Sequence, residues 1–122
     1  MAPSFEEHVQ ELTRKMWRKK FFAIIWEGRD ADLRSHLVAH LEYMIGLERE
    51  GKLFASGPLD LGRSSDGLTV VRVDTIAEAR SIALNDPFVI NGIRSFRIRE
   101  WILMEGSFAV TVNFSDRSTH IE

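Results

Sequence analysis

The chain has 122 residues, of which 44% are hydrophobic and 28% are charged, as in an ordinary soluble globular domain. Its 16 basic and 18 acidic residues give a net charge of −2, and the two signs are interspersed, so we expect no nucleic-acid partner and no membrane partner. The sequence has no cysteine, which excludes disulfides, thiolate metal sites and a cysteine nucleophile and fits a cytoplasmic location.

The N-terminal residues predict a helix. Ser4 and Glu7 have the spacing of a capping box, and apolar side chains follow at helical intervals at Phe5, Val9, Leu12 and Met16. A basic cluster over residues 15–20 fits the carboxyl end of such a helix. We therefore expect a helical extension over residues 1–20. The early acidic residues argue against a secretory or transit signal.

The next segment predicts a buried strand followed by a helix. Residues 21–27 are apolar on both alternating faces, which indicates a strand that is covered on both sides. Asp30 or Asp32 can then cap a helix that runs to about Glu50 and ends at Gly51.

The remaining elements follow from turn signals and periodicity. We expect a short strand over residues 53–56, a polar loop over 60–67 and a third strand over 68–74. A second capping box, Thr75 to Glu78, opens a helix to about Leu84 that the Asp86-Pro87 pair stops. Strands over 96–103 and 108–114 complete the chain, and we expect the last eight residues to be loose.

This order predicts a single α+β domain whose centre is a ferredoxin-like β-α-β-β-α-β plait, with an extra N-terminal helix and an extra C-terminal strand. Two helices can cover only one face of a four-stranded sheet, and the first strand is apolar on both faces. A second copy of the chain would cover the other face, which predicts a homodimer. The N-terminal helix could instead cover part of that face.

One histidine interrupts the apolar side of the helix after residue 33. At 100° per residue, His40 lies within the same arc as Leu33, Leu37, Leu41, Met44 and Leu47, and His36 lies at its edge. Such an imidazole either has its nitrogen atoms hydrogen-bonded in the core or faces a cavity. A metal site from His36 and His40 is a weaker alternative, because the glutamate of a zinc-protease helix is missing.

Asp86 is the second candidate. It precedes Pro87 at a helix exit, where an aspartate commonly accepts local backbone N–H bonds. Alternatively, its carboxylate holds the His40 ring in one tautomer and stabilises its charged form, which would make His40 a general base. The sequence leaves both interpretations open.

Further residues could complete a binding site. Ser56-Gly57-Pro58 offers a hydroxyl and close backbone approach after a short strand, although such a tripeptide is commonly a plain strand-end turn. Phe88, Trp26 and Trp101 could form the walls of a pocket or belong to the core. The sequence contains no phosphate-binding glycine loop and no serine elbow motif.

Several short motifs together resemble the YCII-related domain family over roughly residues 21–103. They are His40-Leu41, Glu50-Gly51-Lys52-Leu53, Gly57-Pro58-Leu59, Glu78-Ala79 and Asp86-Pro87-Phe88. On this resemblance, residues 1–20 are a helical extension, 21–103 the YCII-like core and 104–122 a C-terminal strand and tail.

The resemblance implies a ferredoxin-like domain that dimerises sheet to sheet as a dimeric α/β barrel, with an active site of His40 and Asp86. The family often has Arg-Pro just before its histidine, where this chain has Leu37-Val38. If that arginine binds an anionic substrate, Arg34 would have to replace it here.

We therefore expect a cofactor-free enzyme, an isomerase or a dehydrochlorinase-like lyase, that transfers protons on a small cyclic or aromatic-derived molecule. His40 would be the base and Asp86 its partner, and Ser56 with the Gly57 backbone would bind a developing oxyanion. The alternative is a non-enzymatic small-molecule-binding or accessory domain on the same scaffold.

Overall fold

The computed structural model describes residues 1–29 and 32–121, so Asp30 lies outside the described residues. The chain divides into two units, one spanning Lys20–Ile102 and the other formed by Met1–Lys19 and Leu103–Glu122. No helix among the described residues has both the length and the apolar character needed to cross a membrane.

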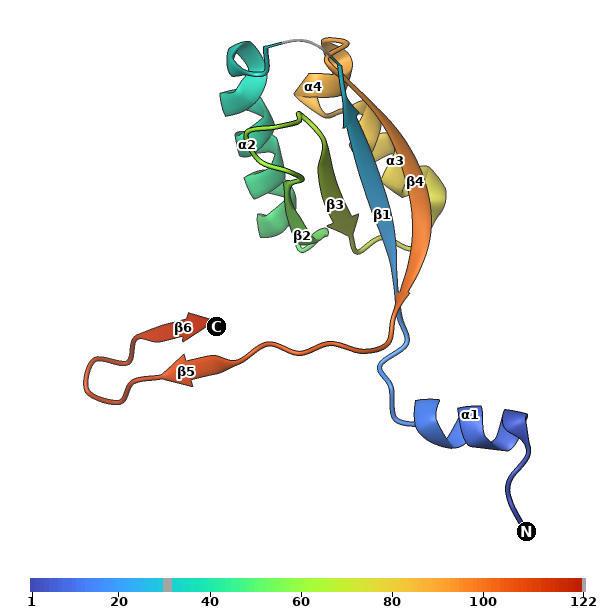
Figure 1. Ribbon diagram of the computed structural model, residues 1–122. Coiled ribbons are helices and arrows are strands. Elements are labelled where there is room, and N and C mark those ends of the chain that lie inside the picture. Colours follow the sequence, from blue (N-terminus) through green and yellow to red (C-terminus); the bar gives the residue numbers. More distant parts are fainter. Residues whose placement is uncertain (30–31, 122) are drawn as a thin grey trace. The chain divides into compact units, whose positions relative to one another are not determined.

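The larger unit is built on a four-stranded sheet with the order β2-β3-β1-β4 (Figure 1). The strands are β1 (Lys19–Gly28), β2 (Leu53–Pro58), β3 (Gly67–Val71) and β4 (Arg94–Leu103). β3 pairs antiparallel with both β1 and β2, and β4 runs against β1 (Figure 1). The protein is therefore an α+β protein with an antiparallel sheet.

Three helices connect these strands: α2 (Arg34–Arg49), α3 (Ile76–Leu84) and α4 (Pro87–Ile90). The predicted order of β1, α2, β2, β3, α3 and β4 is confirmed, and the short α4 is an addition. The Thr75 hydroxyl caps α3 by accepting the Glu78 backbone N–H at 3.2 Å. The N-cap residue of α2 is Leu33, which has no side-chain cap bond, and the preceding Asp32 accepts the Arg34 N–H through Oδ1 at 3.0 Å. Gly51, at φ 75°, follows α2 as predicted.

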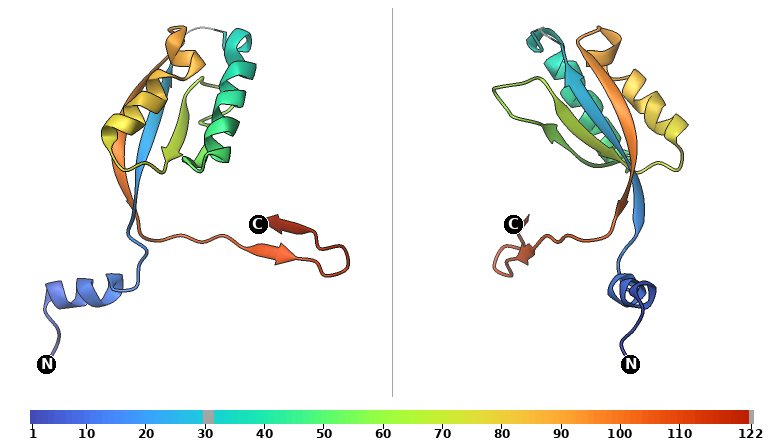
Figure 2. Two further views of the ribbon diagram at one scale, coloured as in Figure 1. Left: turned by 180° about the vertical axis from the view of Figure 1, so that it is seen from behind. Right: turned by 45° about the vertical axis from the view of Figure 1, so that its right-hand side comes forward.

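The core lies between the sheet and the helices, which are on the same side of it (Figure 2). Alternate β1 residues Phe22, Ile24 and Trp26 point to this side and are buried. They pack with Met44 and Leu47 of α2 and with Ala79, Ile82 and Ala83 of α3. The period-2 pattern of the strand and the helical stripes thus meet in one cluster.

The opposite face of β1 carries Phe21, Ala23 and Ile25. Phe21 is fully buried, with its ring centroid 4.5 Å from that of Phe54 and 6.2 Å from that of Trp101. Ala23 and Ile25 are half-buried. Trp101 therefore belongs to the face of the sheet that is turned away from the helices.

The N-terminal segment contains α1 (Phe5–Thr13), which the Ser4 hydroxyl caps by accepting the Glu7 N–H at 3.2 Å. The helix is shorter than predicted. The Thr13 hydroxyl donates back to the Val9 carbonyl. Arg18 donates to the Thr13 carbonyl at 3.1 Å, so this carbonyl at the end of the helix has a hydrogen-bond donor. The basic cluster over residues 15–20 is therefore not part of the helix. Residues 15–18 follow α1, and Lys19 and Lys20 belong to β1.

The C-terminal segment forms a hairpin of β5 (Val110–Val112) and β6 (Thr119–Ile121). The prediction of a loose tail was wrong for Thr119–Ile121, because Thr119 pairs with Val112 and Ile121 with Val110. The turn is fixed by Asp116, whose carboxylate accepts the Ser118 N–H at 2.9 Å. Hydrogen bonds from Ser118 lower the pKa of Asp116.

Candidate active site

A cavity of about 550 Å³ opens between α2, β2 and the loop that precedes β3. One wall comes from α2, where Leu37, Leu41 and Ile45 face the space. The sequence pattern placed Leu37 and Leu41 in the core, but they are 39% and 49% exposed. The predicted apolar arc is thus divided between the core and the cavity wall.

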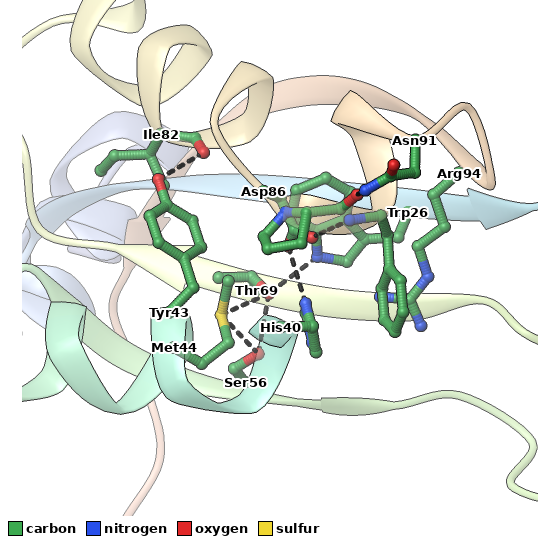
Figure 3. A network of polar contacts seen from close by, with 12 residues as sticks. Trp26, His40, Tyr43, Met44, Ser56, Thr69, Ile82, Asp86, Asn91 and Arg94 are labelled. Carbon is green, nitrogen blue, oxygen red and sulfur yellow. Dashed lines mark hydrogen bonds and ion pairs between the residues drawn. The ribbon is translucent and has the colours of Figure 1, made fainter. Parts of the chain in front are cut away.

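His40 lines this cavity and contacts Asp86, which is not itself part of the lining. His40 Nδ1 lies 2.8 Å from Asp86 Oδ2, and the two residues are 9% and 0% exposed (Figure 3). Asp86 Oδ1 accepts the Phe88 N–H at 2.8 Å and thereby caps α4. The cap interpretation of Asp86 is therefore confirmed, and the second carboxylate oxygen makes the contact with His40 that the other interpretation requires.

The pairing fixes how the His40 ring is presented. A carboxylate accepts hydrogen bonds, so the proton belongs on Nδ1 and the lone pair on Nε2. Among the described residues, no side chain or backbone group hydrogen-bonds to Nε2. The Phe88 ring stacks on the imidazole, with 4.4 Å between centroids and 20° between planes. Since His40 lines the cavity, a ligand can reach a ring that is held in position from two directions.

Ser56, which lines the same cavity as His40, belongs to a network with Thr69, Met44 and Trp26 (Figure 3). Thr69 Oγ1 accepts the Trp26 indole N–H at 2.8 Å and lies 2.7 Å from Ser56 Oγ, and Met44 Sδ is 3.8 Å from Ser56 Oγ. Because Trp26, Met44 and Thr69 are buried, the Ser56 hydroxyl is held at the cavity surface by core residues.

Gly57 and Pro58 also line the cavity, but they do not form the expected strand-end turn. They continue β2, where Gly57 pairs with Leu68 and Pro58 with Gly67. A proline is tolerated there because β2 is an edge strand, which does not need every N–H for pairing.

The other predicted site residues divide into two groups. Arg34, Phe88 and Trp26 line the cavity, whereas His36 and Trp101 do not. At about 100° per residue, His36 lies on the side of α2 that carries Tyr43, and the Tyr43 hydroxyl donates to the Ile82 carbonyl at 2.7 Å. That side faces α3. Within the described part of the chain, no three His, Asp or Glu side chains cluster as a metal site would require.

Arg94 is a cavity residue that was not predicted from the sequence. This side chain is only 6% exposed, lines the cavity and donates from Nε to the Ser65 carbonyl at 2.8 Å. Its guanidinium carbon lies 4.7 Å from the Phe88 ring centroid and 6.0 Å from the Trp26 ring. Burial lowers the pKa of Arg94, and the charges of Asp86 and Asp66 oppose that shift.

The loop over residues 59–66 closes one side of the cavity and is tied down at several points. Asp66 Oδ1 accepts the Gly28 N–H at 2.8 Å, and the Leu59 N–H donates to the Asp66 carbonyl at 3.1 Å. Leu61, Ser64 and Ser65 contribute to the lining. The Asp66 bond connects the loop to the end of β1, and the bond from Arg94 Nε to the Ser65 carbonyl connects it to β4.

Comparison with known proteins agrees with this architecture. The YCII-related domain family matches residues 21–102. The uncharacterized protein YjpA of Bacillus subtilis (strain 168) is 31% identical over 70 residues, which is 57% of this chain and 80% of YjpA.

A solved structure is also similar, that of 5-chloro-2-hydroxyhydroquinone dehydrochlorinase (TftG) from Burkholderia phenoliruptrix AC1100 in complex with 2,5-dihydroxybenzoquinone. Its TM-score is 0.56 at 24% identity, and the match covers 66% of this chain and 92% of that one. At this identity the likeness concerns the fold.

Proposed function

Because the chain belongs to the YCII-related domain family, we propose that it is a cofactor-free enzyme in which His40 transfers protons on a small cyclic or aromatic-derived molecule. One observation carries the proposal: the His40 ring is bonded through Nδ1 to the buried Asp86 carboxylate and lines a cavity large enough for a ligand. A general base needs this combination of an oriented ring and an accessible nitrogen.

In the proposed reaction, Nε2 of His40 takes a proton from a carbon or hydroxyl group of the bound molecule. The electron pair of the broken bond moves into the substrate and forms an enolate-type oxyanion. Asp86 stabilises the resulting imidazolium, and Ser56 donates a hydrogen bond to the oxyanion. His40 then returns the proton to another atom in an isomerisation, or the electron pair expels a leaving group in an elimination.

The substrate class rests on the walls and on the structural neighbour. Leucine and isoleucine side chains of α2 with Trp26 and Phe88 suit a compact ring. TftG has a similar fold, is by name a dehydrochlorinase of a chlorinated hydroxyhydroquinone, and was solved with a benzoquinone bound. Both points support a single-ring substrate and either an elimination or an isomerisation.

The proposal also includes a ferredoxin-like plait that dimerises sheet to sheet. The observed strand order supports it, as does the face with Ala23, Ile25 and Leu68, of which Leu68 is 36% exposed. A second copy of the chain placed there would cover apolar surface. Sedimentation of the wild type as a monomer at micromolar concentration would reject this part, and Leu68→Glu is expected to weaken the dimer.

The test of activity uses two histidines of one helix. The wild-type protein is incubated in D₂O with 5-chloro-2-hydroxyhydroquinone and with unchlorinated ring diketones, and chloride release and deuterium incorporation are measured. His40→Ala is expected to lower the rate roughly 10²–10⁴-fold. His36→Ala is the matched control, because His36 does not line the cavity, and its rate is expected to stay within about twofold.

The same assay separates the enzyme from a binding domain. A binder would take up these rings in the wild type and in His40→Ala with equal affinity, and it would neither exchange protons nor release chloride. Equal loss of activity in both histidine variants would also reject His40 as the base.

A further inference from the structure

The cavity is lined by a buried cation, Arg94, that forms no ion pair with any described residue. Arg94 is only 6% exposed. The nearby carboxylates have other donors: Asp86 accepts from His40 and Phe88, and Asp66 accepts from the Gly28 N–H. A buried charge without a paired anion is costly, because burial removes its water.

The hydrogen-bonding groups of Arg94 are only partly used. Of the five N–H groups of a guanidinium, the one on Nε donates to Ser65, and no acceptor among the described residues takes those on Nη1 and Nη2. Every fully buried side-chain nitrogen in the described chain has a hydrogen-bond partner. Since Nη1 and Nη2 of Arg94 have none, they are accessible, and Arg94 lines the cavity. Nη2 lies next to Gly67, where an added Cβ would be 3.4 Å away.

Packing holds the guanidinium close to the proposed base. The Phe88 ring centroid lies 4.7 Å from the Arg94 guanidinium carbon and 4.4 Å from the His40 ring centroid. The Ser65 carbonyl fixes the guanidinium at the Nε edge. The free edge is a planar fork of the kind that binds a carboxylate or another paired oxygen anion.

From this arrangement we infer that Arg94 binds the anionic group of the substrate, so that the ligand is a single-ring carboxylate or an equivalent ring oxyanion whose ring lies toward His40. This inference deepens the proposed function and rests on it for the cavity being a substrate site. It assigns the anion to Arg94 and not to Arg34, which is exposed and lies at the start of α2.

Binding can be tested without turnover by using benzoate and its uncharged isostere nitrobenzene as probes. Affinities are measured by ¹H–¹⁵N NMR titration, with the Trp26 indole N–H and the Phe88 amide as reporters at the site. The wild type is expected to bind benzoate at least about tenfold more tightly than nitrobenzene. A wild type that binds both equally, or neither, overturns the inference.

Variants then locate the charge. Arg94→Gln is expected to weaken benzoate binding roughly 10- to 100-fold and to leave nitrobenzene binding unchanged. Arg34→Gln tests the competing assignment, because Arg34 also lines the cavity, and it is expected to weaken benzoate binding clearly less than Arg94→Gln does. The matched control is Arg80→Gln, which removes an exposed cation outside the cavity lining and is expected to change both affinities by less than about twofold. Arg94→Lys keeps the charge without the fork, so it is expected to retain part of the preference for benzoate. Equal losses in the Arg34 and Arg94 variants would overturn the assignment.

The outcomes distinguish the two proposals. If Arg94→Gln does not fold, the wild-type preference and Arg94→Lys decide, and an Arg94→Lys variant with no preference for benzoate overturns the inference. Benzoate binding that depends on Arg94, together with no proton transfer in the His40 assay, would reject only the enzymatic function. Proton transfer that Arg94→Gln leaves unchanged would reject only the inference.

Discussion

Asp86→Asn tests the pairing of the imidazole and the carboxylate with an almost unchanged shape. In the wild type, one oxygen accepts the Phe88 N–H and the other faces His40 Nδ1, both at 2.8 Å. A backbone N–H can only donate, so it holds the carbonyl oxygen of the new amide on the Phe88 side. The amide –NH₂ then faces His40, and Nδ1 has to become the acceptor.

The expected result is a change of tautomer. The proton moves to Nε2, which can then no longer accept one from a ligand, so the rate in the D₂O assay should fall roughly 10²–10⁴-fold. Stability should change less. Each charge-assisted bond weakens to a neutral one by about 0.5–1.5 kcal/mol, and removal of a fully buried charge offsets part of that loss.

Long-range ¹H–¹⁵N correlation of the His40 ring measures the tautomer directly, and urea unfolding measures the stability. Asp66→Asn is the matched control, because the Asp66 carboxylate likewise accepts a backbone N–H at 2.8 Å but forms no hydrogen bond with His40. If the ring keeps its proton on Nδ1 in Asp86→Asn, or if the rate is unchanged, the argument from the hydrogen-bond geometry is refuted.

Two further changes test the packing. Gly28→Ala would place a Cβ 2.7 Å from the backbone carbonyl carbon of Ser65, so it should lower the free energy of unfolding by about 1–3 kcal/mol in thermal unfolding. The Cβ of Gly46→Ala meets no described atom within 4 Å, so this variant should stabilise α2 by about 0.5–1 kcal/mol. Similar effects of the two variants would contradict the close approach at Gly28. Burial, with the charges of Asp86 and Glu50, raises the pKa of Tyr43 from 10.0 to about 12. Because the pKa is raised in the folded state, the stabilisation by Tyr43 is complete below pH 10 and is lost as the pH rises toward 12. At pH 8, Tyr43→Phe should therefore be less stable than the wild type by about 1 kcal/mol, because it loses the hydrogen bond to the Ile82 carbonyl. In urea unfolding at alkaline pH this difference in stability should disappear, and a difference that is independent of pH would contradict the prediction.

Local signals predicted the elements of the larger unit well. The Thr75 and Glu78 pair gave the start of α3, and Gly51 the end of α2, because caps and left-handed residues depend on neighbours in the chain. The terminal segments were predicted less well. The pairing of Thr119 with Val112 brings together residues across a turn, and the polar composition of the tail carried no signal for it.

The site was predicted where two independent patterns agreed. Helical periodicity and the resemblance both selected His40, and the Asp86-Pro87 pair marked the carboxylate. Arg94 was missed although a signal existed: the alternation that places Phe96 and Ile98 against the core also places Arg94 on that face. Helical periodicity alone did not distinguish Leu37 and Leu41, which face the cavity, from the buried Met44, because the position of β2 decides which part of the stripe is covered.

The loop over residues 59–66 has a consequence for how such proteins can diversify. It supplies part of the cavity lining while its ends remain attached to the strands that carry the core. Insertions or deletions at Leu61 to Ser64 would enlarge or shrink the cavity without changing the sheet register or the position of the His40 ring. Exchange of this segment between relatives is therefore expected to change the size of the cavity while the rest of the larger unit is retained.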